Sequence, residues 1–553
     1  MNLRLCLLSL ALFAAALPAQ LSGTYSIDPN GPAGTFHSFT EAVNALFVAG
    51  VNGPVDLVVA PGTYTESVLV PPIQGCSPTN RVTFRAQLGP GTVLLGGSAG
   101  DTFALLGVAF LHNSSIGWHG IDFTGGPGHA ISGTQFVEDL EVAHCVFHAG
   151  HRSTAVGEYR HAIITSENSG QELGWRIHHS TLTLSSHTNR TSYGIYLSNG
   201  GGWEIHDNVM DMNGGDQGLY LINNNRRVDT IYNNLFVGTL YAASGAYANN
   251  ACVIRQDVSN FENTIANNTF AITVPTLGCC IATAGYGTGS QTTQNYMFGN
   301  VFAMQGPGVA ICLTSYSTGL PPFQSNGNVF FCPNGEIGRS VANTPGPTTL
   351  AAWQLLTGQD AGSVEADPLL QSPFTAPYDL RPLSNSPVTS VAVNTPSYVV
   401  TDIAGRLRDS QPDAGAYELS GFALYGQGCA GTNALVPAMS SSGTVALGST
   451  NFAFQLAQGA PSTLAVLMGG LSRTMSNQGP LPFALGGGCA IQAAPDAVVS
   501  SVTSAQGAAT VPFPIPSTPS LAGFDLFFQW AVIDAASGSA YGITVSEGGA
   551  LQL

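Results

Sequence analysis

The stretch Ile231-Tyr232-Asn233-Asn234-Leu235-Phe236 decides the fold, because its pattern recurs along the chain. Each copy has an apolar residue, two variable residues, a small or polar centre, one variable residue and a second apolar residue. The copies are Ile116–Ile121 around His119, Val142–Phe147 around Cys145, Ile177–Leu182 around Ser180, Ile205–Met210 around Asn208, Ile231–Phe236 around Asn234, Ile265–Phe270 around Asn268, Met297–Phe302 around Asn300, and the closing Asn328-Val329-Phe330. The centres lie 26, 35, 28, 26, 34, 32 and 28 positions apart. Such unequal spacing favours stacked coils with one loop of variable length over a repeat of fixed period.

The last five centres are all asparagine: Asn208, Asn234, Asn268, Asn300 and Asn328. Asparagine tolerates the left-handed conformation that a sharp bend between strands requires. Stacked asparagine side chains also hydrogen-bond to one another along a stack. The pattern therefore predicts a corner with an asparagine ladder.

A second strand precedes most copies of this six-residue pattern (the repeated phrase), and a turn separates the two strands. These strands are His161–Thr165, Gly194–Ser198, Gly218–Ile222, Ala251–Arg255, Cys280–Thr283 and Ala310–Leu313. Alternation directs one set of side chains inward and the other outward. Each coil thus comprises strand, turn, strand, asparagine corner, strand and variable loop, and the fold class is all-β.

On these residues the chain resembles the right-handed parallel β-helix, or pectate-lyase-like, superfamily. Residues Phe36–Leu46 resemble the amphipathic helix that caps the first coil, and Val55–Val59 with Pro61–Glu66 resemble the first strand and turn. The closing segment of many exported β-helix proteins is matched by Asp367–Leu369, Tyr378–Pro382, Ser386-Pro387, Asp402–Arg406 and Asp413–Glu418. The resemblance covers residues 22–418. The superfamily includes lyases, hydrolases, esterases, epimerases and adhesins, so the resemblance implies architecture rather than one activity.

From Gly421 onward, Gly, Ser, Ala and Pro separate short alternating runs, which predicts a small antiparallel β-sandwich. This region resembles a C-terminal module of secreted planctomycete-type proteins, which implies a role in surface attachment or sorting. We divide the chain into 20–418, the β-helix, and 419–553, the C-terminal domain. Cys429 and Cys489 are the only cysteines in the second domain and are predicted to form a disulfide.

The first residues have a basic start at Arg4 and an apolar run from Leu5 to Leu17, which predicts a secretory signal peptide over residues 1–19. The run is shorter than the roughly 20 residues of a membrane helix. We expect a secreted or cell-surface protein.

The composition limits the partners and the chemistry. The formal net charge is -17, so no broad basic face is available for nucleic acid. All 15 basic residues are arginine, which excludes mechanisms that use a lysine base. A lyase or a paired-carboxylate hydrolase stays open.

One predicted face carries aromatic, cationic and titratable residues together. The candidates for catalysis are Arg255, His161 and His187, and those for substrate binding are Tyr196, Tyr220, Arg190 and Asp216. Tyrosine rings would stack on sugars, arginine would hold carboxylates, and His or Arg would take a proton. Ca²⁺ is a possible cofactor. A solvated face without a ligand is the alternative.

A second group stands beside the corners. His144, His179 and Asp207 share one position, and His178, His206 and Tyr232 share the next. Ligands from neighbouring coils, about 4.8 Å apart, could hold a transition metal. A hydrogen-bonded ladder is the other interpretation.

Two functions follow. The first is an exported protein that binds, and in one version processes, a polysaccharide in a groove on one strand face. The second is a non-catalytic cell-surface or adhesin-like protein that uses the β-helix as a spacer.

Overall fold

A computed structural model describes the chain over most of its length. The described residues are 19–96, 106–111, 115–123, 129–134, 136–148, 160–167, 173–184, 191–223, 227–241, 251–258, 263–276, 278–285, 294–315, 323–339, 345–383, 385–419, 421–521 and 523–553.

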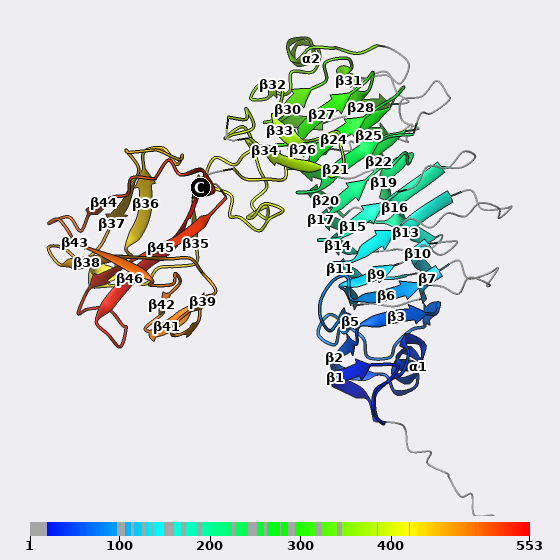
Figure 1. The fold of residues 1–553 in the computed structure, drawn as a ribbon, viewed down its shortest axis with the longest axis horizontal. Coiled ribbons are helices and arrows are strands. Elements are labelled where there is room, and N and C mark those ends of the chain that lie inside the picture. The colour runs from blue at the N-terminus through cyan, green and yellow to red at the C-terminus, as the bar shows by residue number, and fades with distance from the viewer. Residues whose placement is uncertain are drawn as a thin grey trace, which may run out of the picture. The chain divides into compact units, whose positions relative to one another are not determined.

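Three parallel sheets confirm the right-handed parallel β-helix (Figure 1). The β1 sheet contains β1 (Leu21–Ile27), β2 (Val51–Val59), β5 (Val82–Ala86), β8 (Ile116–His119), β11 (Glu141–Ala143), β14 (Arg176–His178), β17 (Glu204–His206), β20 (Asp229–Tyr232), β23 (Asn263–Ala266), β26 (Asn295–Phe298) and β29 (Phe323–Asn326). The β4 sheet contains β4 (Val68–Val70), β7 (Leu106–Leu111), β10 (His129–Thr134), β13 (Arg160–Glu167), β16 (Thr191–Gly200), β19 (Gln217–Asn223), β22 (Cys252–Val258), β25 (Cys279–Gly285), β28 (Val309–Ser315) and β31 (Glu336–Arg339). The β3 sheet contains β3 (Gly62–Thr65), β6 (Val93–Gly96), β9 (Ile121–Phe123), β12 (Val146–His148), β15 (Thr181–Thr183), β18 (Val209–Asp211), β21 (Leu235–Thr239), β24 (Thr269–Thr273), β27 (Val301–Gln305), β30 (Val329–Phe331) and β32 (Val364–Glu365).

Like residues stack on like residues inside the coils. Phe236, Phe270, Phe302 and Phe330 are register partners in successive strands of the β3 sheet. Their ring centroids are 4.9, 5.1 and 5.1 Å apart and the rings are nearly parallel. Burial of each phenylalanine contributes roughly 1.5–3 kcal/mol. The apolar ends of the repeated phrase thus form the core.

The corner contains the asparagine ladder. The Nδ2 atoms of Asn208, Asn234, Asn268 and Asn300 donate to the Oδ1 atom of the next asparagine at 3.0, 3.0, 3.1 and 3.2 Å. The backbone N–H groups of the same four residues donate to the same oxygens at 3.1, 2.9, 3.0 and 2.8 Å. The ladder ends where Asn328 Nδ2 donates to Asp360 Oδ1 at 2.9 Å.

The left-handed conformation, however, belongs to the residue before each ladder position. Positive φ values occur at His144, His179, Asp207, Asn233, Asn267, Gly299 and Gly327. In the first copy the positive φ lies at Gly120, after the expected centre His119, because His119 pairs with Ala143 rather than with Cys145. The expectation that the ladder asparagines themselves adopt this conformation is wrong. The bend therefore uses one residue, and the next residue supplies the hydrogen bonds.

A helix caps the first coil, as predicted, but α1 spans Phe39–Ala49 rather than Phe36–Leu46. Ser38 is its N-cap and accepts from the backbone N–H of Glu41, so the helix begins after Ser38. Glu66 accepts from the N–H groups of Phe39 and Thr40 at 2.9 and 3.0 Å, which satisfies two donors of the first turn.

The last coil is closed by α2, which spans Leu350–Thr357. Trp353 from this helix is buried, and its Nε1 donates to Asp360 Oδ2 at 2.9 Å. Because Asp360 also ends the asparagine ladder, the helix and the ladder share one buried carboxylate. Neither helix in the described part of the chain combines the length and the apolar content that a membrane crossing needs.

Residues 366–419, the closing segment, cover part of the outer face of the β3 sheet. The segment includes the hairpin β33 (Leu370–Ser372) and β34 (Asp379–Pro382). Leu370, Leu380 and Ala416 pack on Leu235 and Ala271. Its buried Arg408 pairs with Glu418, Nη1 to Oε2 at 3.0 Å. Burial raises the pKa of Glu418 to about 8, and the Asp413 carboxylate adds to this rise.

The antiparallel sheets of the C-terminal region begin at Gly421. One sheet is ordered β35 (Gly421–Tyr425), β46 (Ile543–Gln552), β45 (Asp525–Ile533), β38 (Leu464–Gly470) and β43 (Ala497–Val502), and the other is ordered β36 (Ala438–Ser442), β37 (Ala453–Ala457) and β44 (Ala509–Pro512). Two hairpins, β39 (Met475–Ser476) with β40 (Gly479–Pro480) and β41 (Phe483–Gly486) with β42 (Cys489–Ile491), complete the region. The main buried cluster contains Phe454, Trp530 and Leu551. The predicted disulfide between Cys429 and Cys489 is confirmed.

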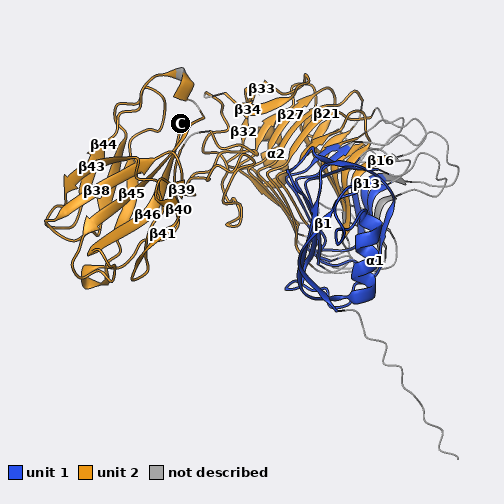
Figure 2. Cartoon of the chain, turned by 60° about the horizontal axis from the view of Figure 1, so that its bottom comes forward, with its two compact units in different colours: residues 1–182, 195–203 blue, residues 183–194, 204–553 orange. Residues whose placement is uncertain are grey.

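The chain separates into two compact units, coloured in Figure 2. The first comprises residues 1–182 and 195–203, and the second comprises residues 183–194 and 204–553. The division into 20–418 and 419–553 stays a prediction.

Candidate functional site

The second unit carries a stack of three side chains on the predicted binding face of the β4 sheet. Tyr220 on β19 has Tyr193 of β16 on one side and Arg255 of β22 on the other. The two tyrosine rings are 5.7 Å apart with an interplanar angle of 18°. The Arg255 guanidinium carbon lies 4.7 Å from the centroid of the Tyr220 ring, and the two residues are register partners. A guanidinium at this distance from an aromatic face makes a cation–π contact.

This stack changes the role that Tyr220 can have. Tyr193 and Arg255 contact the ring from the strands on either side, so neighbouring side chains cover the faces of the Tyr220 ring. This differs from the predicted stacking of a sugar ring on Tyr220. The arrangement instead places the Arg255 guanidinium against an aromatic ring, which restricts where the guanidinium can lie.

The structure places the other predicted site residues as follows. Tyr196 is buried, with 4% of its surface exposed. Asp216 is buried too, and its Oδ2 atom accepts from the N–H and the hydroxyl of Ser192 at 2.8 and 3.0 Å. His161 lies on β13, whereas His187 and Arg190 lie outside the described residues. The structure therefore brings Tyr220 and Arg255 together and gives Asp216 a structural contact.

The first unit carries a charged cluster on the outer face of the β1 sheet, centred on Glu141. The Oε2 atom of Glu141 lies 3.4 Å from His119 Nε2 and 3.4 Å from Arg176 Nη2, and its Oε1 atom lies 3.3 Å from His178 Nε2. Arg81 Nη1 is 3.5 Å from Oε2. The adjacent His119 and His178 imidazoles hold the pKa of Glu141 far below its usual range. Glu141 therefore stays ionised and serves as an acceptor, not as a general acid.

Histidines continue this cluster towards the corner. His178 Nδ1 lies 3.0 Å from His179 Nδ1, so one of the two nitrogens carries the shared proton. The rings of His144 and His179 are 4.8 Å apart. Burial lowers the pKa of His144, and the neighbouring His178 and His119 add to this effect. These contacts favour the hydrogen-bonded ladder that the sequence left as one interpretation.

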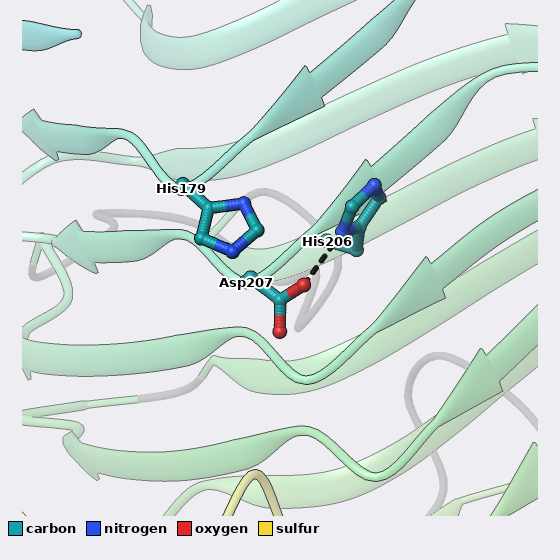
Figure 3. Close-up of side chains that lie close together, drawn as sticks. All are labelled: His179, His206 and Asp207. Atoms are coloured by element: carbon teal, nitrogen blue, oxygen red, sulfur yellow. Dashed lines mark hydrogen bonds and ion pairs between the residues drawn. The ribbon is translucent and has the colours of Figure 1, made fainter. Parts of the chain in front are cut away.

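The second unit contains Asp207, from the first predicted position beside the corners, and His206 and Tyr232, from the second. His206 Nδ1 lies 2.7 Å from Asp207 Oδ2 (Figure 3), and the His206 ring stacks on Tyr232 at 4.6 Å. Figure 3 also draws His179, which belongs to the first unit. We assign no metal-ligand set to these residues.

Two features of these sites were missed from the sequence. A straight strand directs Tyr193 and Tyr196 to opposite faces, so alternation gave no reason to place Tyr193 beside Tyr220. Glu141 and Arg176 each precede the first apolar residue of a repeated phrase and are register partners. Aligning the phrases one residue further back would have found that pair.

No protein-family model and no curated protein matches the chain. Among solved structures, the chain is similar to a pectate lyase (14% identity, TM-score 0.37, covering 72% of this chain and 97% of that one). It is also similar to a rhamnogalacturonan lyase (12% identity, TM-score 0.36, 70% and 96% covered) and to the pectin methylesterase of Aspergillus niger (12% identity, TM-score 0.27, 52% and 87% covered). At these identities the likeness concerns the fold.

Proposed function

We propose that this protein is exported and binds an acidic polysaccharide along the outer face of the β4 sheet. The observation that carries the proposal is the Tyr193–Tyr220–Arg255 stack. Neighbouring coils repeat the same outward position at about 4.8 Å intervals, so a long ligand that follows the axis meets several coils. A polymer matches such a surface better than a small molecule.

The Arg255 guanidinium supports an acidic ligand rather than a neutral one. It lies over the Tyr220 ring, and a guanidinium is the side-chain group that binds carboxylates in a bidentate manner. The chain has a formal net charge of -17, so its overall charge repels a carboxylated ligand. Such a ligand therefore has to be bound by a cationic side chain at the site itself. Tyr220 acts here as a positioning residue for Arg255.

The test is a screen of the purified full chain against acidic and neutral polysaccharides. Arg255→Ala should weaken binding to the acidic polymer ten- to a hundredfold, because a charge-assisted hydrogen bond contributes about 1.5–3 kcal/mol. It should also reduce the dependence of binding on salt. Arg473→Ala is the matched control, because Arg473 stacks over Tyr425 at 5.7 Å in the C-terminal region.

Tyr220→Ala tests the positioning role separately. If Tyr220 acts through Arg255, the double variant binds no more weakly than Arg255→Ala alone. Additive losses would give Tyr220 a ligand contact of its own. Unchanged binding of Arg255→Ala to every polymer that the parent binds would contradict the site.

The screen also tests processing of the polymer. Unsaturated or shortened products would identify a lyase or a hydrolase, and Arg255, His161 and His187 are the proposed catalytic residues. Measurements with and without Ca²⁺ test the proposed cofactor. A protein that binds without products is a binding protein.

The alternative function is a non-catalytic cell-surface or adhesin-like spacer. The continuous asparagine ladder and phenylalanine stack favour it, because both give a stiff repeating core. In this proposal the C-terminal domain attaches or sorts the protein. Cell fractionation tests it: the full chain should stay with the cell surface, whereas a chain that ends at Leu419 should be released into the medium.

A further inference from the structure

Three cysteines lie on one face of the β4 sheet in three consecutive strands. Cys252 on β22 and Cys279 on β25 are register partners in adjacent parallel strands. Cys312 lies on β28, where its register partner is Ala282 rather than Cys279. The next strand, β31, places Arg339 beside Cys312.

These three cysteines belong to one small buried cluster. Cys252, Cys279 and Cys312 are fully buried and pack with Ala282 and Val309. The Cys279 side chain hydrogen-bonds with the thiols of both Cys252 and Cys312, so the central sulfur is adjacent to the other two. Burial, followed by these hydrogen bonds, raises the pKa of Cys279 well above its usual value.

We propose that Cys252 and Cys279 form a disulfide that joins two consecutive coils, while Cys312 stays a thiol. Paired residues of adjacent strands have Cα atoms about 4.8 Å apart. A disulfide needs a Cα separation of roughly 4.4–6.8 Å, and the spacing of this pair, which is reduced in the structure, lies within that range. Among the described residues, the bond would be the second disulfide, after Cys429–Cys489.

The reaction is a two-electron oxidation with a small-molecule disulfide as oxidant. The two thiols lose their protons and two electrons, and the S–S bond of oxidised glutathione is cleaved to give two molecules of reduced glutathione. The bond has to form during folding, because both cysteines are buried in the folded chain and are then out of reach of the oxidant.

Cys312 is excluded by register. Its thiol reaches Cys279 diagonally across the sheet face, and bonding to Cys279 would require its backbone to move. The third cysteine is therefore expected in reduced form beside the bond.

The experiment refolds the reduced full chain in a glutathione redox buffer that contains a metal chelator. Remaining thiols are then alkylated, and non-reduced peptides are mapped by mass spectrometry. We expect a peptide pair that links Cys252 to Cys279, together with alkylated Cys312. Cys252→Ser and Cys279→Ser should each abolish the link completely, whereas Cys312→Ser should retain it.

Cys280→Ser is the matched control, because Cys280 neighbours Cys279 in sequence and is equally buried. This variant should retain the link, which also assigns the bond to Cys279 without ambiguity. Circular dichroism and formation of Cys429–Cys489 establish that each variant has folded. Alkylation of both Cys252 and Cys279 in folded parent protein would overturn the proposal. A link from Cys279 to Cys312 in the parent would overturn it too.

Discussion

Replacing Asn268 by leucine removes the centre of the ladder and keeps the number and branching of the side-chain heavy atoms. The side chain makes five hydrogen bonds: Nδ2 donates to Ile231 O, Ala266 O and Asn300 Oδ1, and Oδ1 accepts from the backbone N–H and the Nδ2 of Asn234. After the change, the Asn234 N–H loses its acceptor and the Ile231 carbonyl loses a donor. Each buried group left without a partner costs about 1–3 kcal/mol, so we expect a loss of about 2–6 kcal/mol in the free energy of unfolding.

Urea unfolding monitored by circular dichroism measures this loss. Hydrogen exchange adds a local readout, because the Asn234 amide should lose protection before the amides of distant coils. Asn477→Leu is the control: Asn477 lies exposed in a turn of the C-terminal region, and its replacement should change stability by less than about 0.5 kcal/mol. If Asn268→Leu unfolds at the same urea concentration as the parent, the ladder does not stabilise the coils as argued.

Three further predictions concern Glu418, Glu66 and Tyr220. The pKa of Glu418 in the folded state, about 8, lies above its ordinary value. The contribution of Glu418 to stability is therefore complete below about pH 4.5 and is lost as the pH rises through 8, and Glu418→Gln should flatten that decline in thermal melts across this range. Glu66→Ala should lower stability by about 1–2 kcal/mol in urea titrations, because two N–H donors of α1 lose their acceptor. Tyr220→Phe should bind the acidic polymer like the parent, since the ring that supports Arg255 is kept, and a tenfold loss in a binding isotherm would assign the hydroxyl a ligand contact.

The coil and the ladder could be predicted because they are local and repeated. A phrase with apolar residues at fixed offsets from a polar centre permits few packings other than stacked strands, and the ladder hydrogen bonds connect the predicted residues. The left-handed residue of the bend, however, lies one position before the asparagine for which we predicted it. The sequence contained the evidence, because Asp207, Asn233 and Asn267 precede the ladder residues and are types that tolerate positive φ.

The outer faces could be predicted only in part, because their contacts depend on side chains from different coils. Tyr220 and Arg255 were expected on one face and are in contact. The partner on the other side, Tyr193, was missed because alternation along a straight strand assigned it to the opposite face. Burial of Tyr196 and the Ser192 contact of Asp216 were missed as well, since a repeat pattern contains no information about what covers a strand.

The separation of neighbouring strands therefore links the packing inside the coils to the side-chain contacts on their outer face. Stacked rings such as Phe270 and Phe302 and the asparagine ladder fix neighbouring strands at one separation and in one register. Because Tyr220 and Arg255 are partners in that register, Arg255 lies over the Tyr220 ring. A change to the ladder near Asn234 should consequently alter ligand binding as well as stability, because the Tyr220 ring is positioned by the same coil. A binding loss in Asn268→Leu larger than the unfolded fraction explains would support this link, and intact affinity of the folded fraction would contradict it.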